Sequence, residues 1–378
     1  MGVMRWLAGP VGRAASTRSP LFDAIRGAAA RVTTPLLPDD YLQLANPLWS
    51  ARELRGRIVE VRRETEDSAT LVVRPGWGFD FDYRPGQYVG IGVGVEGRWH
   101  WRSYSLTSVP RRNDKLISIA VKAMPDGFLS GHLVDGLPAG TVVRLAAPAG
   151  NFQLPEPPPR RVLFLTAGSG ITPVIAMLRS LDRHREMPDV AHVHSAPRPV
   201  DVMFADELDD YSRRYHGERP DEGRYRLHVQ LTRSTGQFTP ADLDATFPDW
   251  RTRETWACGP AALLDTIEVF WAANGLRDRL HTERFELSRA DVSGRGGTVE
   301  FGVSDRSTTV DGATTLLEAG EAIGVRMPFG CRMGICQTCV VPLAAGHVTD
   351  LRSGRQHAAG ELIQTCVCSP AGDCRLDL

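Results

Sequence analysis

Four cysteines near the C-terminus have the spacing of an iron–sulfur site. Cys331, Cys336 and Cys339 form a C-x4-C-x2-C run, and Cys366 follows at a distance. This is the spacing of a plant-type [2Fe–2S] site, in which one tight loop supplies three thiolates and a separate segment supplies the fourth. The pattern therefore predicts a [2Fe–2S] cluster held by Cys331, Cys336 and Cys339 together with one cysteine of a later segment.

Two other uses of cysteine fit the pattern less well. A structural zinc site usually has two short C-x-x-C-like pairs, whereas the split here is three and one. A secreted disulfide framework is not expected from seven cysteines in 378 residues, so the composition favours a reduced, cytoplasmic compartment. Cys258, Cys368 and Cys374 remain, and on spacing alone Cys368 competes with Cys366 as the fourth ligand.

Length and charge narrow the remaining possibilities. A chain of 378 residues is too long for one ordinary core and predicts two or three domains. The formal net charge of −1, without interleaved aromatic and basic residues, gives no indication of nucleic-acid binding. No apolar run reaches the roughly eighteen residues of a transmembrane helix, so no membrane span is expected.

The sequence of residues 1–50 predicts an N-terminal arm rather than a folded domain. Up to Pro38 the arm carries five arginines and one acidic residue, Asp23. Apolar residues at helical spacing over residues 21–32 predict one short amphipathic helix. We expect this segment to be a helix that caps the next domain or a frayed tail, and the alternative is a basic helix that touches a membrane or a membrane-bound partner.

Residues 51–155 have the pattern of an antiparallel barrel. Short strands alternate with turns and no helical periodicity separates them, which predicts a closed antiparallel sheet. The expected strands cover residues 56–62, 69–74, 87–95, 116–121 and 141–145. A proline-rich connector at residues 155–160 marks the end of this domain.

Residues 160–286 alternate strands with helices, which predicts a parallel α/β sheet. The buried strand 161–166 runs into a turn with Gly168 and Gly170, and a helix follows. Glycines let the backbone approach a pyrophosphate, and Pro173 suits the first helical turn because its missing N–H is not needed there. Further strands are expected at residues 190–195, 200–204, 226–232 and 255–257.

The rest of the chain predicts a linker and a third domain. Residues 287–297 contain glycine and serine and predict a flexible linker. Residues 298–378 then predict a hairpin, a short helix at 314–322 and the cysteine loop.

Three further motifs carry a resemblance. Arg102-Ser-Tyr-Ser105 precedes Gly127-Phe-Leu-Ser130, and Cys258-Gly-Pro260 follows a later strand. With these motifs in this order, the chain from about residue 50 onward resembles the ferredoxin–NADP reductase superfamily, in the subgroup with a C-terminal plant-type ferredoxin domain. The resemblance implies a multi-domain fold: an antiparallel β-barrel flavin domain, a parallel α/β nucleotide domain and a β-grasp ferredoxin domain. It also implies that Cys366, four residues before Pro370, is the fourth cluster ligand rather than Cys368.

The resemblance assigns the flavin to the first domain. Tyr104 offers a flat aromatic face to the isoalloxazine ring, and Arg102 offers charge to the flavin phosphates. Ser105 is expected to hydrogen-bond near flavin N5, the atom that accepts hydride. FAD is the expected flavin and FMN the alternative. The flavin-binding residues implied are Arg102, Tyr104, Ser105, Thr107, Gly127, Leu129 and Ser130.

The resemblance assigns the nicotinamide dinucleotide to the second domain. Cys258 and Glu283 are expected beside the nicotinamide ring, and with Ser105 they are the candidate catalytic residues. We expect Cys258 to supply shape and polarity rather than a nucleophile, because no base is close in sequence. Glu283 can steer the ring or relay a proton, and a structural role is the alternative. The dinucleotide-binding residues implied are Gly168, Gly170, Thr172, Pro173, Arg198, Arg233, Gly259 and Pro260.

The three domains imply an electron path from NAD(P)H through flavin to the cluster, since a flavin accepts electrons in pairs and returns them singly. Arg198 and Arg233 stand where NADPH-using relatives read the 2′-phosphate, which favours NADPH over NADH. Similarity to actinobacterial reductases implies a separate acceptor, a membrane di-iron acyl-CoA desaturase or alkane hydroxylase, and a cytoplasmic protein peripheral to the membrane. The alternatives are a reductase of a soluble ring-hydroxylating oxygenase and a non-catalytic redox sensor.

Overall fold

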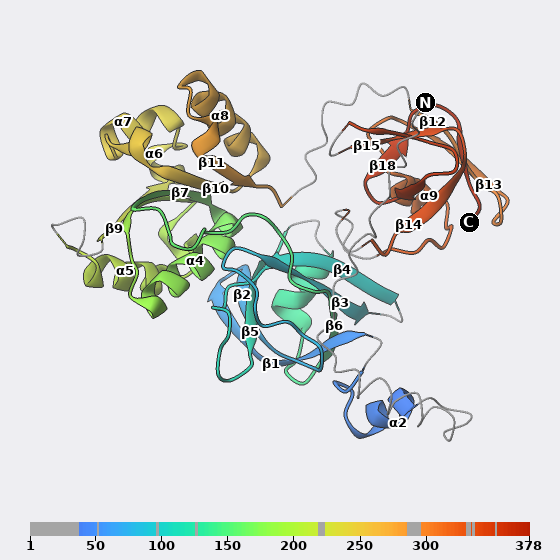
Figure 1. Cartoon of the computed structure of the whole chain (residues 1–378), viewed down its shortest axis with the longest axis horizontal. Helices are drawn as coiled ribbons and strands as arrows, with labels where there is room; N and C mark the ends of the chain where they lie inside the picture. Colours follow the sequence, from blue (N-terminus) through green and yellow to red (C-terminus); the bar gives the residue numbers. More distant parts are fainter. Residues whose placement is uncertain are drawn as a thin grey trace, which may run out of the picture.

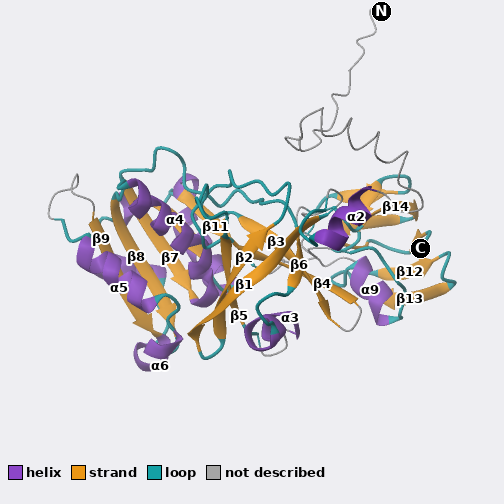
Figure 2. Ribbon diagram, turned by 90° about the horizontal axis from the view of Figure 1, so that it is seen from below, coloured by secondary structure: helices purple, strands orange, loops and turns teal. Residues whose placement is uncertain are grey.

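The chain folds into three units, each built on its own sheet or pair of sheets (Figure 1). The barrel, which is the first unit, lies between the second, α/β unit and the third, C-terminal unit. Figure 2 shows the same order from below. The computed structural model describes residues 38–50, 53–95, 98–124, 128–217, 224–285, 296–329, 334, 337–351 and 354–378. The helix expected at residues 21–32 lies outside this set, as do Gly127, Cys331 and Cys336.

The first unit is a six-stranded sheet with strand order β4-β3-β6-β1-β2-β5, in which every pairing is antiparallel. Alternate residues point to one face, so Ile58, Leu71 and Val89 are fully buried in one core. After β5, the short helix α3 (Phe128–Gly131) continues into a turn at His132–Gly136. The strands are β1 (Leu54–Thr65), β2 (Ser68–Pro75), β3 (Tyr88–Val95), β4 (Arg98–Ser105), β5 (Ile117–Lys122) and β6 (Val142–Leu145).

The second unit is a parallel five-stranded sheet with strand order β11-β10-β7-β8-β9. Both faces are apolar: Val162 and Phe164 of β7 enter one core, and Leu163 and Leu165 enter the other. Helices α4 (Ile171–His184) and α5 (Ala205–Arg214) cover the first face, and α8 (Ala261–Ala273) covers the second (Figure 1). The strands are β7 (Arg161–Ala167), β8 (Asp189–Ala196), β9 (Arg224–Leu231), β10 (Glu254–Cys258) and β11 (Leu280–Glu283).

The strand expected at residues 200–204 is wrong. Pro199–Asp201 forms a 3-10 turn instead, and Val202, Met203 and Phe204 are buried in the loop that leads into α5. The apolar run reflects this burial, while Pro199 lacks the N–H that a sheet ladder needs. Burial of a loop and burial of a short strand give the same pattern in sequence.

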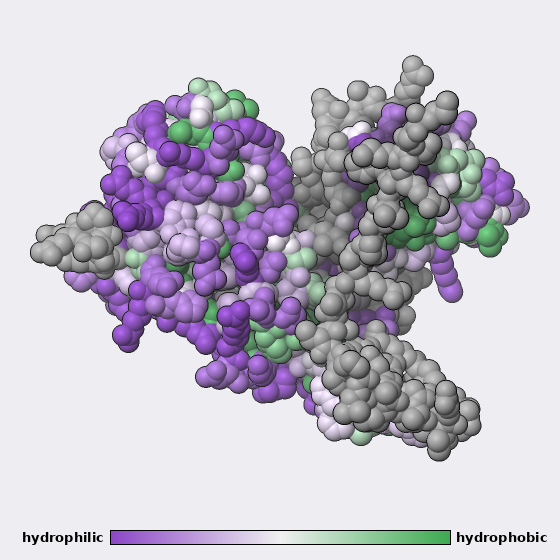
Figure 3. Space-filling view, viewed as in Figure 1, coloured by the Kyte–Doolittle hydropathy of each residue, from purple (hydrophilic) through white to green (hydrophobic). Residues whose placement is uncertain are grey.

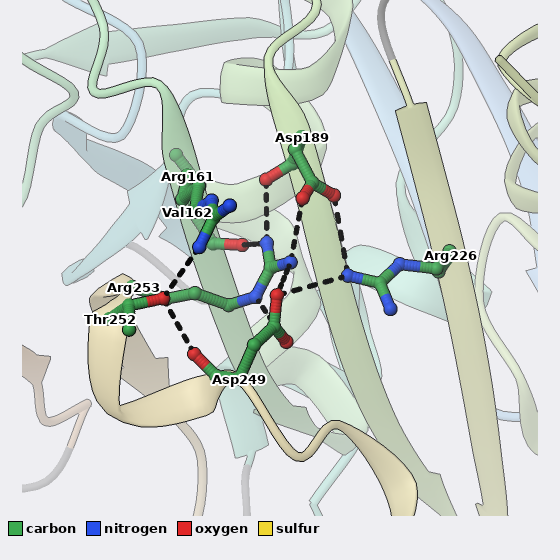
Figure 4. A network of polar contacts seen from close by, with 7 residues as sticks. All are labelled: Arg161, Val162, Asp189, Arg226, Asp249, Thr252 and Arg253. Carbon is green, nitrogen blue, oxygen red and sulfur yellow. Dashed lines mark hydrogen bonds and ion pairs between the residues drawn. The ribbon is translucent and has the colours of Figure 1, made fainter. Parts of the chain in front are cut away.

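A buried ion network fixes the amino ends of the central strands (Figure 4). The Arg253 side chain, 0% exposed, donates to Asp189 Oδ2 at 2.8 Å and to Asp249 Oδ2 at 2.6 Å. It also donates to the Val162 carbonyl at 3.2 Å, and Arg226 pairs with Asp189 at 3.3 Å. This network lies at the edge of the sheet opposite the glycine turn, so its role is to hold β7, β8 and the β10 entry together.

The third unit contains a five-stranded sheet, β13-β12-β19-β14-β17, and a three-stranded sheet, β16-β15-β18. Thr315 caps α9 (Leu316–Ala322) through a reciprocal bond with Glu318, and the apolar face of α9 joins the core. The strands are β12 (Gly297–Phe301), β13 (Arg306–Val310), β14 (Val340–Ala345), β15 (His347–Asp350), β16 (Gln356–Ala358), β17 (Leu362–Gln364), β18 (Cys368–Pro370) and β19 (Cys374–Leu376).

Hydrogen bonds join the barrel to the α/β unit. From α4, Arg179 Nη1 donates to the Thr107 carbonyl at 2.8 Å, and Arg183 Nη1 donates to the Pro110 carbonyl at 3.0 Å. The Trp256 indole on β10 donates to the Gln153 carbonyl at 3.3 Å. The loop after β4 is therefore fixed by the helix that follows the glycine turn.

The outer surface of the α/β unit is largely hydrophilic in the view of Figure 3. Among the helices that the structure describes, including the N-terminal α2 (Pro38–Ala45), none is both long and apolar enough to cross a membrane.

Candidate functional site

The end of β4 presents a buried polar atom without a protein partner. Ser105 is the last residue of β4 and is 2% exposed, yet its Oγ makes no hydrogen bond within the described part of the chain. Its neighbour Tyr104 is half-buried, and burial raises the pKa of its phenol, which therefore stays neutral. A shielded hydroxyl of this kind is costly unless a ligand supplies the missing partner.

The other residues of the flavin motifs have protein contacts. Arg102 is exposed, and its Nη1 donates to the Trp101 carbonyl at 2.9 Å. Thr107 is buried, with its hydroxyl 2.8 Å from Ser118 Oγ. Thr107 thus contacts β5 through its hydroxyl and α4 through its carbonyl, while Arg102 lies at the surface.

In the turn that leads into α3, the described side chains contact other parts of the barrel unit. Leu129 lies in the barrel core, and Ser130 Oγ accepts a hydrogen bond from the Met124 amide at 3.1 Å. These two side chains fix the turn. Gly127, the third residue expected here, lies outside the described residues.

The glycine turn after β7 comes very close to the end of β10. A Cβ on Gly170 would lie 2.0 Å from the Cys258 carbonyl oxygen, so only glycine fits there. Gly168 has φ +53° and open space beside it, a conformation that other residues rarely adopt. Thr172 Oγ1 donates back to the Ser169 carbonyl at 2.9 Å, and Pro173 is buried in the first turn of α4.

The carboxyl edge of the same sheet aligns Thr166, Cys258 and Glu283 on three neighbouring strands. Cys258 is fully buried, and this burial, with the adjacent Glu283 carboxyl, raises the pKa of its thiol well above the usual range. Glu283 is half-buried, but its Oε2 is shielded and has no partner in the described part of the chain. Burial raises the pKa of Glu283 to about 8, so the carboxyl is mostly protonated at neutral pH.

Beyond this edge, Gly259 and Pro260 lead into α8. A Cβ on Gly259 would lie 3.2 Å from Ala167 Cβ, and Pro260 is exposed. The two turns that follow β7 and β10 therefore lie side by side, as a shared dinucleotide surface requires.

Sequence reasoning missed a buried polar chain behind this edge. Thr166 Oγ1 lies 2.8 Å from both His192 Nε2 and His194 Nδ1, and His192 Nδ1 lies 2.7 Å from the Tyr225 hydroxyl. Burial lowers the pKa of His194 to about 4 and that of His192 well below its usual value, so both are neutral. The only sign of this chain in the sequence was the His-x-His alternation within a buried strand. The hydrogen-bond partners of the two histidines, Thr166 on β7 and Tyr225 on β9, are distant in sequence.

The two candidate phosphate-reading arginines lie on adjoining loops. The Arg233 amide donates to the Pro197 carbonyl at 3.2 Å, which ties the turn after β9 to the loop that carries Arg198. Arg198 forms a two-bond ion pair with Asp201, at 2.9 and 2.7 Å. The exposed guanidinium of Arg233 has no partner within the described part of the chain.

In the C-terminal unit, two of the four expected cluster ligands lie together. Cys339 Sγ is 3.2 Å from Cys366 Sγ, and both residues are buried. Thr365 Oγ1 donates to the Cys339 carbonyl at 3.3 Å, and Gln364 Nε2 donates to the Gly334 carbonyl at 2.9 Å. The segment with Cys366 is therefore attached to the cysteine loop, and this buried pair of sulfurs fits the thiolate donors that an iron–sulfur cluster needs.

Comparison with known proteins identifies the families of the first and third units. Residues 56–154 match the oxidoreductase FAD-binding domain family, and residues 301–371 match the 2Fe-2S iron–sulfur cluster binding domain family. An NADPH oxidoreductase of Mycobacterium tuberculosis is 57% identical over 367 residues, which cover 97% of this chain and 95% of that protein. The chain therefore belongs to the same family as this mycobacterial NADPH oxidoreductase. It is an NAD(P)H oxidoreductase with an FAD-binding domain and a [2Fe–2S] domain.

More distant proteins match most of this oxidoreductase. The glycine betaine monooxygenase reductase subunit of Chromohalobacter salexigens is 29% identical over 85% of the chain and 94% of that protein. The solved structure of phthalate dioxygenase reductase, described as a modular structure for electron transfer from pyridine nucleotides to [2Fe–2S], matches with a TM-score of 0.57. At 23% identity over 86% of the chain and 97% of that protein, it confirms the predicted three-part fold.

Proposed function

We propose that this oxidoreductase takes electrons from NADPH and delivers them, through FAD and the [2Fe–2S] cluster, to a separate oxygenase or desaturase. The supporting observation is a pair of shielded polar atoms without protein partners, Ser105 Oγ and Glu283 Oε2. They lie in the two places where the motifs expect the flavin and the nicotinamide.

The residues on the barrel hold and orient the flavin in this proposal. Tyr104 packs its ring against the isoalloxazine, and Arg102 offers charge to the phosphates. The Ser105 hydroxyl gives its unused hydrogen bond to the flavin near the reacting nitrogen. When bound, FAD accepts a hydride and gives up electrons singly to the [2Fe–2S] cluster, which Cys331, Cys336, Cys339 and Cys366 hold.

The α/β unit positions the nicotinamide dinucleotide. The turn with Gly168 and Gly170 brings backbone amides to the pyrophosphate, with Thr172 and Pro173 fixing the start of α4. Cys258 stays a neutral thiol and shapes the ring pocket with Gly259 and Pro260. Glu283 holds its proton at neutral pH and can donate a hydrogen bond from the carboxyl edge of the sheet.

The acceptor we propose is a membrane di-iron acyl desaturase or hydroxylase, which places the protein in the cytoplasm at a membrane surface. A soluble oxygenase is the second candidate, because the 29%-identical relative is a monooxygenase reductase subunit. Reconstitution of electron transfer to each kind of acceptor distinguishes these two candidates. Product formed with NADPH, this protein and desaturase-containing membranes supports the first, and turnover only with a soluble oxygenase supports the second.

Stopped-flow spectroscopy tests the core of the proposal. Mixing the purified protein with NADPH is expected to bleach the flavin band rapidly. A redox sensor without catalytic activity need not show such fast bleaching. Ser105→Ala is expected to slow this bleaching about tenfold or more, since its hydrogen bond forms near the reacting nitrogen. Ser103→Ala on the same strand is the matched control and is expected to leave the rate unchanged. Equal rates for the wild type and both variants would remove Ser105 from the proposal.

A further inference from the structure

Three metal-binding side chains meet in the C-terminal unit, apart from the paired cluster cysteines. Asp350, His357 and Cys368 each offer a ligand atom, and these atoms all lie within 4.8 Å of one another. They come from three strands of one sheet, of which β15 and β18 are labelled in Figure 1. We propose that these three residues form a zinc site distinct from the [2Fe–2S] cluster.

The strand register places the three side chains on one face of the sheet. Asp350 on β15 lies directly opposite Cys368 on β18. His357 on β16 lies opposite Val348, two residues before Asp350 on the same strand. Because directly opposed residues share a face and strand residues two apart do too, the carboxylate, imidazole and thiol converge.

A fourth residue orients the histidine. His357 Nδ1 lies 2.8 Å from Glu361 Oε2, and an ionised carboxylate can only accept, so Nδ1 donates. With the proton on Nδ1, the imidazole offers the lone pair of Nε2 to a metal ion. This carboxylate–histidine arrangement is the usual support for a zinc-bound imidazole.

The backbone around the site is fixed before any metal binds. The Asp350 amide donates to the Arg355 carbonyl at 2.8 Å, and the Gly354 amide donates to the Asp350 carbonyl at 2.8 Å. Asp350 and Cys368 are buried, whereas His357 is half-buried and gives access from solvent. The ligand atoms lie within 4.8 Å of one another, and tetrahedral zinc requires separations of about 3.4–3.8 Å.

The donor set selects the metal. One thiolate, one imidazole and one carboxylate suit zinc, whereas calcium and magnesium prefer oxygen ligands throughout. With three protein ligands, water completes the tetrahedron. Cys366 Sγ lies 3.2 Å from Cys339 Sγ, whereas the ligand atom of Cys368 lies with those of Asp350 and His357, so we assign the two cysteines of the Cys366-Val-Cys368 segment to different groups. Zinc would link all three strands directly beside the segment that carries a cluster ligand.

Metal content of the full-length holoprotein tests the proposal. The protein is purified from medium with added zinc, and zinc and iron are counted by mass spectrometry. About one zinc is expected beside two irons per chain. His357→Ala and Cys368→Ser are expected to lower zinc at least about tenfold while iron stays unchanged.

Matched controls are His347→Ala, an exposed histidine on β15, and Cys374→Ser, a buried cysteine on β19. Both are expected to retain zinc. If Cys368→Ser fails to fold, His357→Ala and Asp350→Asn carry the test with the cluster spectrum as the check of folding. Wild-type protein with full iron and no zinc overturns the proposal, as does zinc that both His357→Ala and Cys368→Ser retain. Loss of iron in Cys368→Ser without any wild-type zinc assigns this thiol to the cluster and also overturns it.

Discussion

In the proposed function, the choice of NADPH over NADH is assigned to Arg198 and Arg233, two exposed arginines of the α/β unit. Arg198 is ion-paired with Asp201, so its guanidinium is held in place before a 2′-phosphate arrives. Arg198→Ala is expected to raise the KM for NADPH about tenfold, equivalent to about 1.4 kcal/mol, and to change the KM for NADH less than about twofold. Steady-state ferricyanide reduction with each nucleotide measures both constants.

Arg213→Ala is the control for this substitution, because Arg213 is also exposed and also pairs with an aspartate three residues away. It is expected to leave both constants unchanged. A parallel rise for NADPH and NADH in Arg198→Ala would show that Arg198 does not read the 2′-phosphate.

Glu283 couples the site to the stability of the α/β unit. Its carboxyl has a pKa of about 8 in the folded protein and an ordinary value of 4.5. Between these values the unfolded chain loses the proton and the folded protein keeps it, so stability falls as pH rises, by at most about 1.4 kcal/mol per pH unit. Below pH 4.5 the effect is absent, and above pH 8 it is complete.

Glu283→Gln removes this ionisation. The variant is therefore expected to gain thermal stability relative to the wild type between pH 5 and pH 9, as followed by tryptophan fluorescence. Glu186→Gln, at an exposed position, should track the wild type across the range. A constant difference between Glu283→Gln and the wild type at every pH would mean that Glu283 ionises normally in the folded protein.

At the scale of strands, the buried Arg253 holds the amino ends of the α/β sheet. Arg253→Ala removes the fully buried partner of Asp189 and Asp249 and leaves them only the longer contacts with Arg226, and removing one member of a buried ion network costs about 3–5 kcal/mol. We expect a lower urea midpoint for this unit. The flavin spectrum should be unchanged, because the network lies away from the flavin-binding barrel.

Arg251→Ala serves as the control for this prediction, since Arg251 pairs with Asp244 at the surface and such pairs contribute about 1 kcal/mol or less. Similar midpoints for Arg251→Ala and Arg253→Ala would show that burial of the Arg253 network adds no stability.

The same elements show what could be predicted from sequence. Strand periodicity and glycine turns predicted the barrel and the parallel sheet, because burial on one or two faces leaves a local pattern. The Arg253 network, the His192–Thr166–His194 chain and the Asp350–His357–Cys368 cluster were not predicted. Each depends on side chains from strands far apart in sequence, and only the strand order and register bring them together. Residues 200–204 show the opposite error, a local apolar run without a strand.

For the whole molecule, the order of the three units predicts that the cofactors act in series. Hydride enters at the α/β unit and barrel, and single electrons leave through the C-terminal unit. Cys366→Ser removes one thiolate of the buried Cys339–Cys366 pair and is expected to disturb the cluster while leaving the flavin site intact. Reduction of cytochrome c by NADPH should therefore fall about tenfold or more, whereas ferricyanide, which reduced flavin can supply directly, should be reduced within about twofold of the wild-type rate.

The same substitution at Cys374, a buried cysteine of the same unit outside the four-cysteine pattern, controls for general damage to the C-terminal unit. Cys374→Ser should retain both activities, because the path from flavin to cluster remains complete. An equal loss of both activities in Cys366→Ser, with flavin content unchanged, would place the cluster on the path to ferricyanide too. The flavin would then not be the point at which the one-electron and two-electron halves of the reaction separate.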